Sequence, residues 1–210
     1  MVLDTSGFTG GGPLASLIFD IVEECTQKDF IGIVLDAGIN PGSPAQLALA
    51  SALSKATARH ELEYFVPEAL SDSGENAIVR ISTALSGGTL CRHITDAVAK
   101  YGAERVTLEL ERVRMDFTLP SLGGVGKELS NDEMLELKAM HKATSFFSPE
   151  LMVNYFTYRD KNGPHFVLHD NAKSLRRKLA AGARAGIKYT FLFYPQVSDI
   201  YDDILSNGGI

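Results

Sequence analysis

The residues whose types and spacing suit acid–base chemistry are carboxylates around Leu110. Glu109 and Glu111 occupy alternate positions of a β-rich run, and Asp116 follows shortly after them. Because alternate residues of a strand point to the same side, the two glutamates would share one face. Two carboxylates in different environments allow one to donate a proton while the other accepts one. This segment is therefore a candidate for general acid–base work.

A structural interpretation of these glutamates is the one that we favour. They alternate with Leu108 and Leu110, as on a half-exposed strand, and Arg112 and Arg114 follow as candidate ion-pair partners. Paired side chains of this kind need no catalytic role.

Two histidines and a glycine-rich turn also suggest ligands. His165 and His169 share one face of a β-rich run, but the sequence offers no third metal ligand, so we expect an exposed hairpin face. The stretch 7–12 follows a strand and opens a helix, as phosphate loops do, but it lacks their Lys-Ser/Thr ending, which favours a tight turn. We therefore expect no metal and no cofactor.

Short β-rich runs alternate with helical stretches along the chain. The expected core strands are 2–5, 31–36, 62–66, 78–83, 105–110 and 189–193. Strands that alternate with helices indicate parallel βαβ units, and the apolar run Ile31–Leu35 indicates a strand covered on both faces. The sequence thus predicts an α/β fold, a single domain over 1–210 with about six parallel strands.

A β-hairpin is inserted before the last unit, at about 154–170. Its strands would be Tyr155–Arg159 and His165–His169, with a turn at Lys161–Pro164. The glycine-rich segment Thr118–Leu129 is expected to be a loop.

Two helix starts carry clear signals. Ser130 and Glu133 form a capping box, and Asp170 precedes a helix expected at Ser174–Arg184. The second helix carries a basic cluster that we interpret as a solvated face, formed by Lys173, Arg176, Arg177 and Lys178.

Composition excludes several partners. The net charge of -6 weighs against nucleic acid, and no apolar stretch approaches the ~20 residues that cross a bilayer. Cys25 and Cys91 give neither a disulfide framework nor a metal spacing. Together with the lack of a visible signal peptide, this predicts a cytoplasmic protein.

Three stretches carry a resemblance to a known family. They are Leu110–Pro120, Tyr155–Asp160 and His169–Ser174, within a region of roughly 105–193. In order and spacing they resemble the family-18 glycoside hydrolases, specifically the spore-germination and peptidoglycan-directed branch. The resemblance implies a truncated or open (β/α) TIM-type barrel. Its third and fourth family strands would lie at Val2–Gly11 and Ile31–Gly38, and the first two would be absent.

The catalytic motif of that family is degenerate in this chain. Family members carry Asp-x-x-Asp-x-Asp-x-Glu on the fourth strand, with the glutamate as proton donor. Here only Asp36 matches, because the acid position is Gly38 and the earlier positions are Ile31 and Val34. Glycine cannot donate a proton, so we expect no chitinase-type hydrolysis.

Two further parts of the family site are missing. The family's Met-Tyr-Asp would fall near Ile81–Ala84, which contains neither Tyr nor Asp. Family members stack a sugar ring on a tryptophan of the last strand. This chain has no tryptophan, and Phe193 is the residue nearest to that position. We assign no catalytic residue from the sequence.

The resemblance leaves three hypotheses. The first is a non-catalytic domain that binds a carbohydrate, a peptidoglycan-type ligand or a protein partner at the C-terminal face of its strands. The candidate ligand-binding residues are Asp36, Tyr64, Glu68, Glu111, Asp116 and Tyr194. The second is a glycoside hydrolase of altered mechanism that uses Glu68, Glu111 or Asp116. The third is an assembly protein of a spore-forming bacterium, with homo-oligomers covering the open edges of the barrel.

Overall fold

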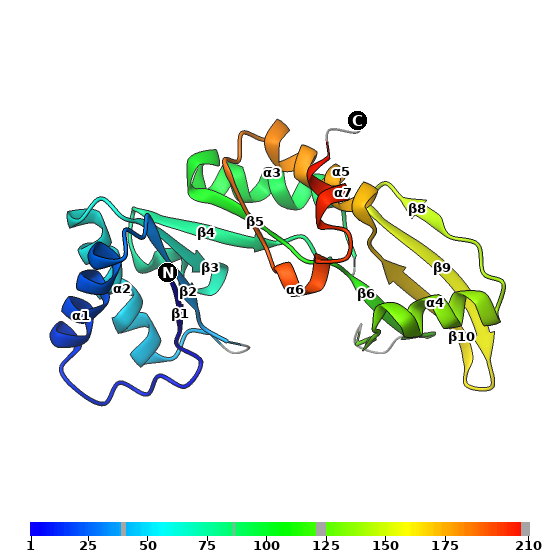
Figure 1. The fold of residues 1–210 in the computed structure, drawn as a ribbon, viewed down its shortest axis with the longest axis horizontal. Helices are drawn as coiled ribbons and strands as arrows, with labels where there is room; N and C mark the ends of the chain where they lie inside the picture. The colour runs from blue at the N-terminus through cyan, green and yellow to red at the C-terminus, as the bar shows by residue number, and fades with distance from the viewer. Residues whose placement is uncertain (39–40, 86, 121–124, 207–210) are drawn as a thin grey trace. The chain divides into compact units, whose positions relative to one another are not determined.

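The computed structural model describes residues 1–38, 41–85, 87–120 and 125–206. It divides into two compact units, which are treated separately below. The first comprises Met1–Ile81 with Ala97–Thr107, and the second comprises Ser82–Asp96 with Leu108–Ile210. Strands and helices alternate along the first half of the chain, up to about residue 110 (Figure 1).

A six-stranded sheet carries the predicted α/β fold. Its order is β1 (Val2–Asp4), β2 (Gly32–Asp36), β3 (Glu63–Pro67), β4 (Ala77–Ser82), β5 (Val106–Leu110) and β11 (Tyr189–Leu192). The first four strands pair in parallel. Neighbours in the sheet follow one another in the chain, as in a (β/α) barrel, whereas a doubly wound sheet reverses its order. The prediction of an open TIM-type barrel is confirmed.

Helices connect these strands, and hydrogen bonds from capping side chains help to define where one of them begins. They are α1 (Leu14–Gln27), α2 (Pro44–Arg59), the short η1 (Glu68–Ser73), α3 (Leu90–Tyr101) and η2 (Ala103–Arg105). At the start of α2, Ser43 accepts a hydrogen bond from the backbone of Gln46, and the Gln46 side chain accepts one from the backbone of Ser43. This reciprocal capping satisfies amides that the helix itself cannot pair.

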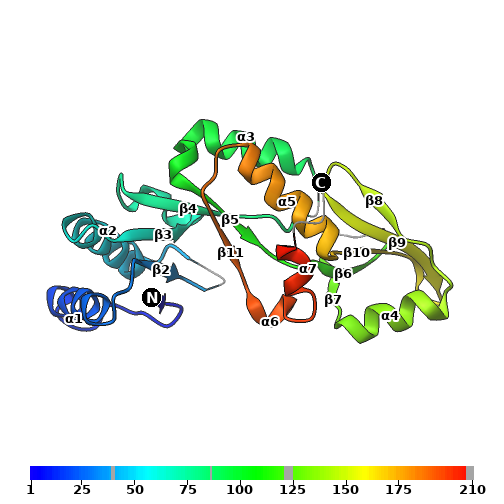
Figure 2. The ribbon, with the colours of Figure 1, turned by 45° about the horizontal axis from the view of Figure 1, so that its top comes forward.

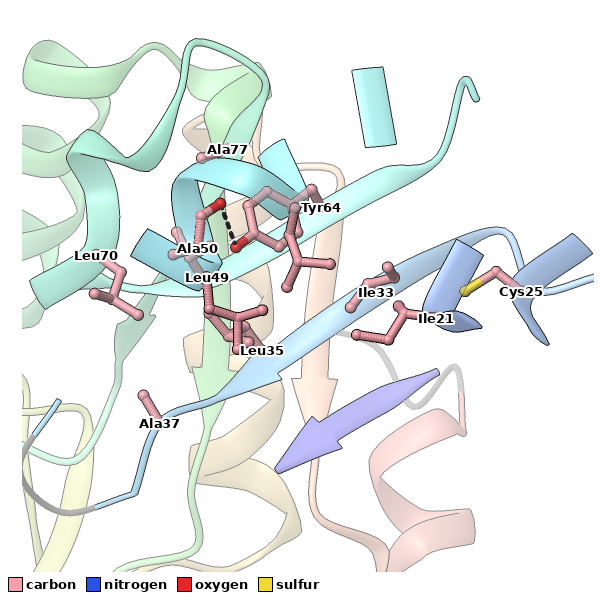
Figure 3. Packing of buried hydrophobic residues seen from close by; sticks show 12 residues of the cluster. Ile21, Cys25, Ile33, Leu35, Ala37, Leu49, Ala50, Tyr64, Leu70 and Ala77 are labelled. Carbon is pink, nitrogen blue, oxygen red and sulfur yellow. Dashed lines mark hydrogen bonds between the residues drawn. The ribbon is translucent and has the colours of Figure 1, made fainter. Parts of the chain in front are cut away.

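The core of the first unit packs α1, α2 and η1 onto β2 and β3 (Figure 3). Ile33 and Leu35, which share one face of β2, are completely buried, whereas Val34 on the other face is half-buried. Ile31 lies outside the strand and is 77% exposed, so the predicted covering of both faces is only partial. Tyr64 of β3 is also completely buried, and its hydroxyl donates a hydrogen bond to the Ala50 carbonyl of α2 at 3.1 Å.

The predicted hairpin belongs to a second, antiparallel sheet of five strands (Figure 2). The order is β7 (Lys127–Glu128), β6 (Arg114–Thr118), β10 (Gly163–His169), β9 (Val153–Asp160) and β8 (Phe146–Ser148). Helix α4 (Asn131–Met140) begins at the predicted capping box and packs Met134 against Phe156 and Val167 of this sheet. The segment expected as a loop contains β7, and its residues 121–124 lie outside the described ranges.

Three helices complete the second unit. They are α5 (Ala172–Arg184), α6 (Tyr194–Val197) and α7 (Tyr201–Leu205). The N-cap of α5 is Asn171, which accepts a hydrogen bond from the Ser174 amide at 3.0 Å. The expected start at Ser174 was therefore late, because Asn171 caps the helix from just after Asp170.

The interpretation of the basic cluster as a solvated face was wrong for Lys178. This ammonium is 1% exposed and donates a hydrogen bond to Asp170 at 2.7 Å. The Asp170 carboxylate also accepts from the Val113 amide at 3.0 Å and from the Ser174 hydroxyl at 2.7 Å. A buried ion pair is tolerated only when its remaining hydrogen-bonding positions are satisfied in this way.

Among the helices of the described ranges, none combines the length and the apolar character that a bilayer crossing demands.

Removal of the Lys178 charge should destabilise the second unit strongly. We expect Lys178→Ala to lower the free energy of unfolding by about 3–5 kcal/mol, because Asp170 would remain as an uncompensated buried carboxylate. Urea denaturation would measure the change, and Lys173→Ala, an exposed position of the same helix, is the matched control. A loss below ~1 kcal/mol for Lys178→Ala would contradict this account.

Candidate functional site

A cavity of ≈ 330 Å³ lies within the second unit, where β5 leads into β6. Its apolar wall includes Val113, Met115, Phe117 and Leu168, and its polar groups come from Glu111, Arg112, Arg114, Glu128 and Gln196. Binding sites for small molecules commonly combine an apolar lining with a few converging polar groups. This cavity is therefore the candidate site.

Glu111 is the sequence candidate that the cavity contains. It is half-buried just beyond β5, and its carboxylate accepts a hydrogen bond from the Ser82 hydroxyl at 2.6 Å. The same hydroxyl accepts from the Ala84 amide at 3.0 Å, which fixes the serine. Leu108 and Leu110 are buried on either side of the half-buried Glu109, so the predicted alternation of this strand is confirmed.

Arg112 does not pair with the glutamates as predicted. Its side chain is 5% exposed and forms an ion pair with Asp199, which holds the pKa of that carboxyl below its usual range. Arg112 also donates to the Gln196 carbonyl at 3.0 Å. Among the described residues, nothing pairs with the buried Arg112 Nε or with the buried Gln196 Oε1. Both residues line the cavity, although these two atoms are themselves buried.

Arg114 adds a second guanidinium to the same wall. Its Nε donates to the Leu129 carbonyl at 3.2 Å. Burial lowers the pKa of Arg114, and the positive charge of Arg112 lowers it further. Two neighbouring guanidinium groups therefore contribute to one cavity.

Asp116 is engaged in a separate network. It accepts hydrogen bonds from the Tyr158 hydroxyl at 2.7 Å and from His165 Nδ1 at 3.0 Å, while His165 Nε2 lies 3.1 Å from Asp160. The Tyr158 ring stacks between His141 and His165, at 4.5 and 4.4 Å between centroids. Asp116 does not line the cavity, although Met115 and Phe117 on either side of it do.

The prediction of an exposed histidine face was wrong. His165 and His169 are each 6% exposed, and their rings pack against those of Tyr158 and Phe156, respectively. The described part of the chain holds no cluster of His, Cys, Asp and Glu arranged for a metal ion.

Tyr194 and Phe193 follow β11 and are 58% and 63% exposed. The Tyr194 ring meets the edge of Tyr201 at 5.4 Å between centroids. Tyr194 does not line the cavity, but Gln196 of the same short helix does.

The remaining candidates belong to the first unit. Asp36 is exposed at the end of β2, and its carboxylate accepts from the Gly38 amide at 3.1 Å. Glu68 is exposed at the start of η1, with the Tyr101 hydroxyl at 3.5 Å. Tyr64 is a core residue, as described above. The ligand-binding roles assigned to these residues, and to Asp116 and Tyr194, stay predictions.

Gly38 adopts a conformation that side chains disfavour. Its φ is +70°, and a Cβ placed on it would lie 2.8 Å from Ser6 Cβ. A larger residue here would require the backbone to shift. Position 38, which the sequence resemblance assigns to the family's proton donor, therefore has a backbone conformation suited to glycine.

Sequence reasoning missed three features of the cavity. Gln196 and Ser82 carried no motif, and the arginines were interpreted only as partners for glutamates. The alternation of Arg112 and Arg114 was the one available signal, because it places two cations close together along a strand.

No family model and no curated protein sequence matches the chain. Solved structures do. The sporulation-specific glycosylase ydhD of Bacillus subtilis matches 90% of this chain and 77% of its own, with a TM-score of 0.63 and 14% identity. The fold is that of family-18-type glycoside hydrolases. The spore cortex-lytic enzyme SleL of Bacillus megaterium QM B1551 matches 98% of this chain with a TM-score of 0.65 and 19% identity. The class V chitinase of Nicotiana tobaccum matches 97% of this chain with a TM-score of 0.65 and 14% identity.

The chain spans 59% of the SleL chain and 78% of the tobacco chitinase chain. At these identities the likeness concerns the fold, and it confirms the resemblance noted in the sequence at that level.

Stability of the protein should depend on pH through His169. Burial, followed by the positive charges of Lys138 and Arg112, lowers the pKa of His169 from 6.5 to about 4. The unfolded chain therefore binds a proton between about pH 6.5 and 4 that the folded chain excludes, so stability falls as pH falls through this range. We expect a loss of about 2 kcal/mol between pH 7.5 and 5, measured by urea denaturation.

His169→Gln is the control, because glutamine can still bond to the Ser145 hydroxyl, which lies 3.0 Å from His169 Nε2. The variant should lose most of this pH dependence, whatever its stability at pH 7.5. An equally steep loss in both proteins would contradict the assignment to His169.

Proposed function

We propose that this chain binds a saccharide in the cavity of the second unit. The observation that carries the proposal is the convergence of the polar residues Glu111, Arg114 and Gln196 on one cavity with an apolar wall. Sugars present hydroxyl groups that both donate and accept hydrogen bonds, together with apolar C–H faces. The polar groups and the apolar wall of Val113, Met115 and Phe117 complement these two features.

Apart from the cavity itself, two observations support a sugar ligand. Phe193 and Tyr194 expose aromatic rings at the end of β11, on the segment that supplies Gln196. Exposed rings on a soluble protein offer flat apolar surfaces against which a sugar face can pack. The fold is shared with proteins described as a glycosylase, a chitinase and a cortex-lytic enzyme.

Binding without chitinase-type hydrolysis is the form of this function that we favour. Gly38 stands where the family's proton donor would stand, and its backbone conformation disfavours a side chain. A spore association, a cytoplasmic location and self-association stay predictions.

Calorimetry with chito-oligosaccharides and muropeptides tests the proposal. Glu111→Gln and Gln196→Ala should each weaken binding by about tenfold, which corresponds to the ~1.4 kcal/mol of one lost polar contact. Asp132→Asn, an exposed change on α4, should leave affinity unaltered. Failure of all the saccharides to bind at millimolar concentration would refute the proposal.

A hydrolase that uses Glu111 is the second candidate. It is favoured by the short hydrogen bond from Ser82, which holds the Glu111 carboxylate at the cavity wall in one orientation. A carboxylate held in this way is a suitable general acid or base. Release of reducing sugar that disappears in Glu111→Gln would support this candidate, and unchanged rates in both Glu111→Gln and Asp116→Asn would exclude it.

A further inference from the structure

We propose that the cavity selects saccharides that carry a carboxylate, and that Arg114 is the residue that determines this selectivity. The inference rests on the proposed function, because it concerns the same cavity. It adds the chemical class of the ligand and the group that recognises it.

The first observation is that Arg114 has hydrogen-bond donors that the protein does not use in the described ranges. Its Nε is used by the Leu129 carbonyl, but within the described ranges its terminal nitrogens have no hydrogen-bond partner and no ion pair. Arg112, by contrast, is neutralised by Asp199. The carboxylates of Asp199 and Glu128 also act on the charge of Arg114, but neither forms an ion pair with it in the described ranges. The wall therefore has one guanidinium held in an ion pair and one, half-buried, whose terminal nitrogens remain free for a ligand.

The second consideration is the shape of the free group itself. Arg114 lines the cavity, and its two terminal nitrogens have no partner in the described part of the chain. A planar guanidinium binds a carboxylate with two parallel N–H donors, which a neutral hydroxyl cannot match. Partial burial strengthens the attraction, because solvent screens it less.

The anionic groups of the cavity limit the ligand further. Glu111 lines the cavity, and Glu128 lines it from an exposed position where water screens its charge. The cavity therefore presents a cation at Arg114 and a hydrogen-bond acceptor at Glu111. A ligand with one carboxylate and several hydroxyl or amide donors fits this polarity, whereas a small multivalent anion would be repelled by the glutamates.

Matched pairs of sugars test the selectivity directly. N-Acetylmuramic acid differs from N-acetylglucosamine by one lactyl ether that carries a carboxylate, and glucuronic acid differs from glucose by one oxidised carbon. We expect at least one acidic member to bind ten times more tightly than its neutral partner. The pair that shows this preference distinguishes a lactyl carboxylate from a uronic acid.

Variants of Arg114 assign the preference. Arg114→Gln should abolish the preference, so that the acidic and the neutral sugar of a pair bind with affinities within about twofold of each other. Arg114→Lys keeps the charge but loses the two-pronged contact, so the preference should fall several-fold. Arg92→Gln is the matched control, because Arg92 is 83% exposed and pairs only with Asp96.

The outcomes separate this inference from the proposed function. Equal binding of acidic and neutral sugars by the wild type, or an unchanged preference in both Arg114 variants, would overturn the selectivity and leave saccharide binding intact. If neither member of either pair binds, the proposed function fails as well. Thermal melting checks that each variant is folded. If Arg114→Gln does not fold, Arg114→Lys still tests the preference.

Discussion

The geometry of the candidate site depends on one buried carboxylate. Asp170 accepts hydrogen bonds from Lys178 and Ser174 of α5 and from the amide of Val113. Val113 lies between Arg112 and Arg114 in the chain. The hydrogen bond to its amide therefore also holds the backbone from which both arginine side chains extend. The ion pair is costly to bury, and four residues are arranged so that its polar atoms are satisfied.

The polarity of the cavity follows from how its charges are compensated. Asp199 neutralises Arg112, and the hydroxyl of Ser82 restrains Glu111 without neutralising it. Arg114 donates from Nε to a backbone carbonyl, and its terminal nitrogens have no partner within the described ranges. A site with opposite charges at separate positions orients a ligand better than a uniformly charged one does, because reversing the ligand places like charges together.

The sequence predicted those features that local chemistry decides. The apolar runs located β2 and β5, and the capping box at Ser130 located α4. Lys178 and the two histidines were misjudged because their burial depends on partners that sequence spacing does not reveal. Arg112, for example, meets the Gln196 carbonyl across 84 positions of the chain. The cavity was missed for the same reason, since it joins the ends of β4 and β5 to β6 and α6.

The proposed sugar site and the position that the sequence resemblance aligns with the family's acid lie in different parts of the chain. Gly38 follows β2 in the first unit, where its positive φ and the proximity of Ser6 concern only the turn after that strand. The cavity is lined wholly by the second unit, including the segment between β5 and β6, β6 itself and the helix that supplies Gln196. The lack of a side chain at position 38 therefore places no constraint on the residues around Arg114. Their polarity would be free to suit a ligand that is bound and not cleaved.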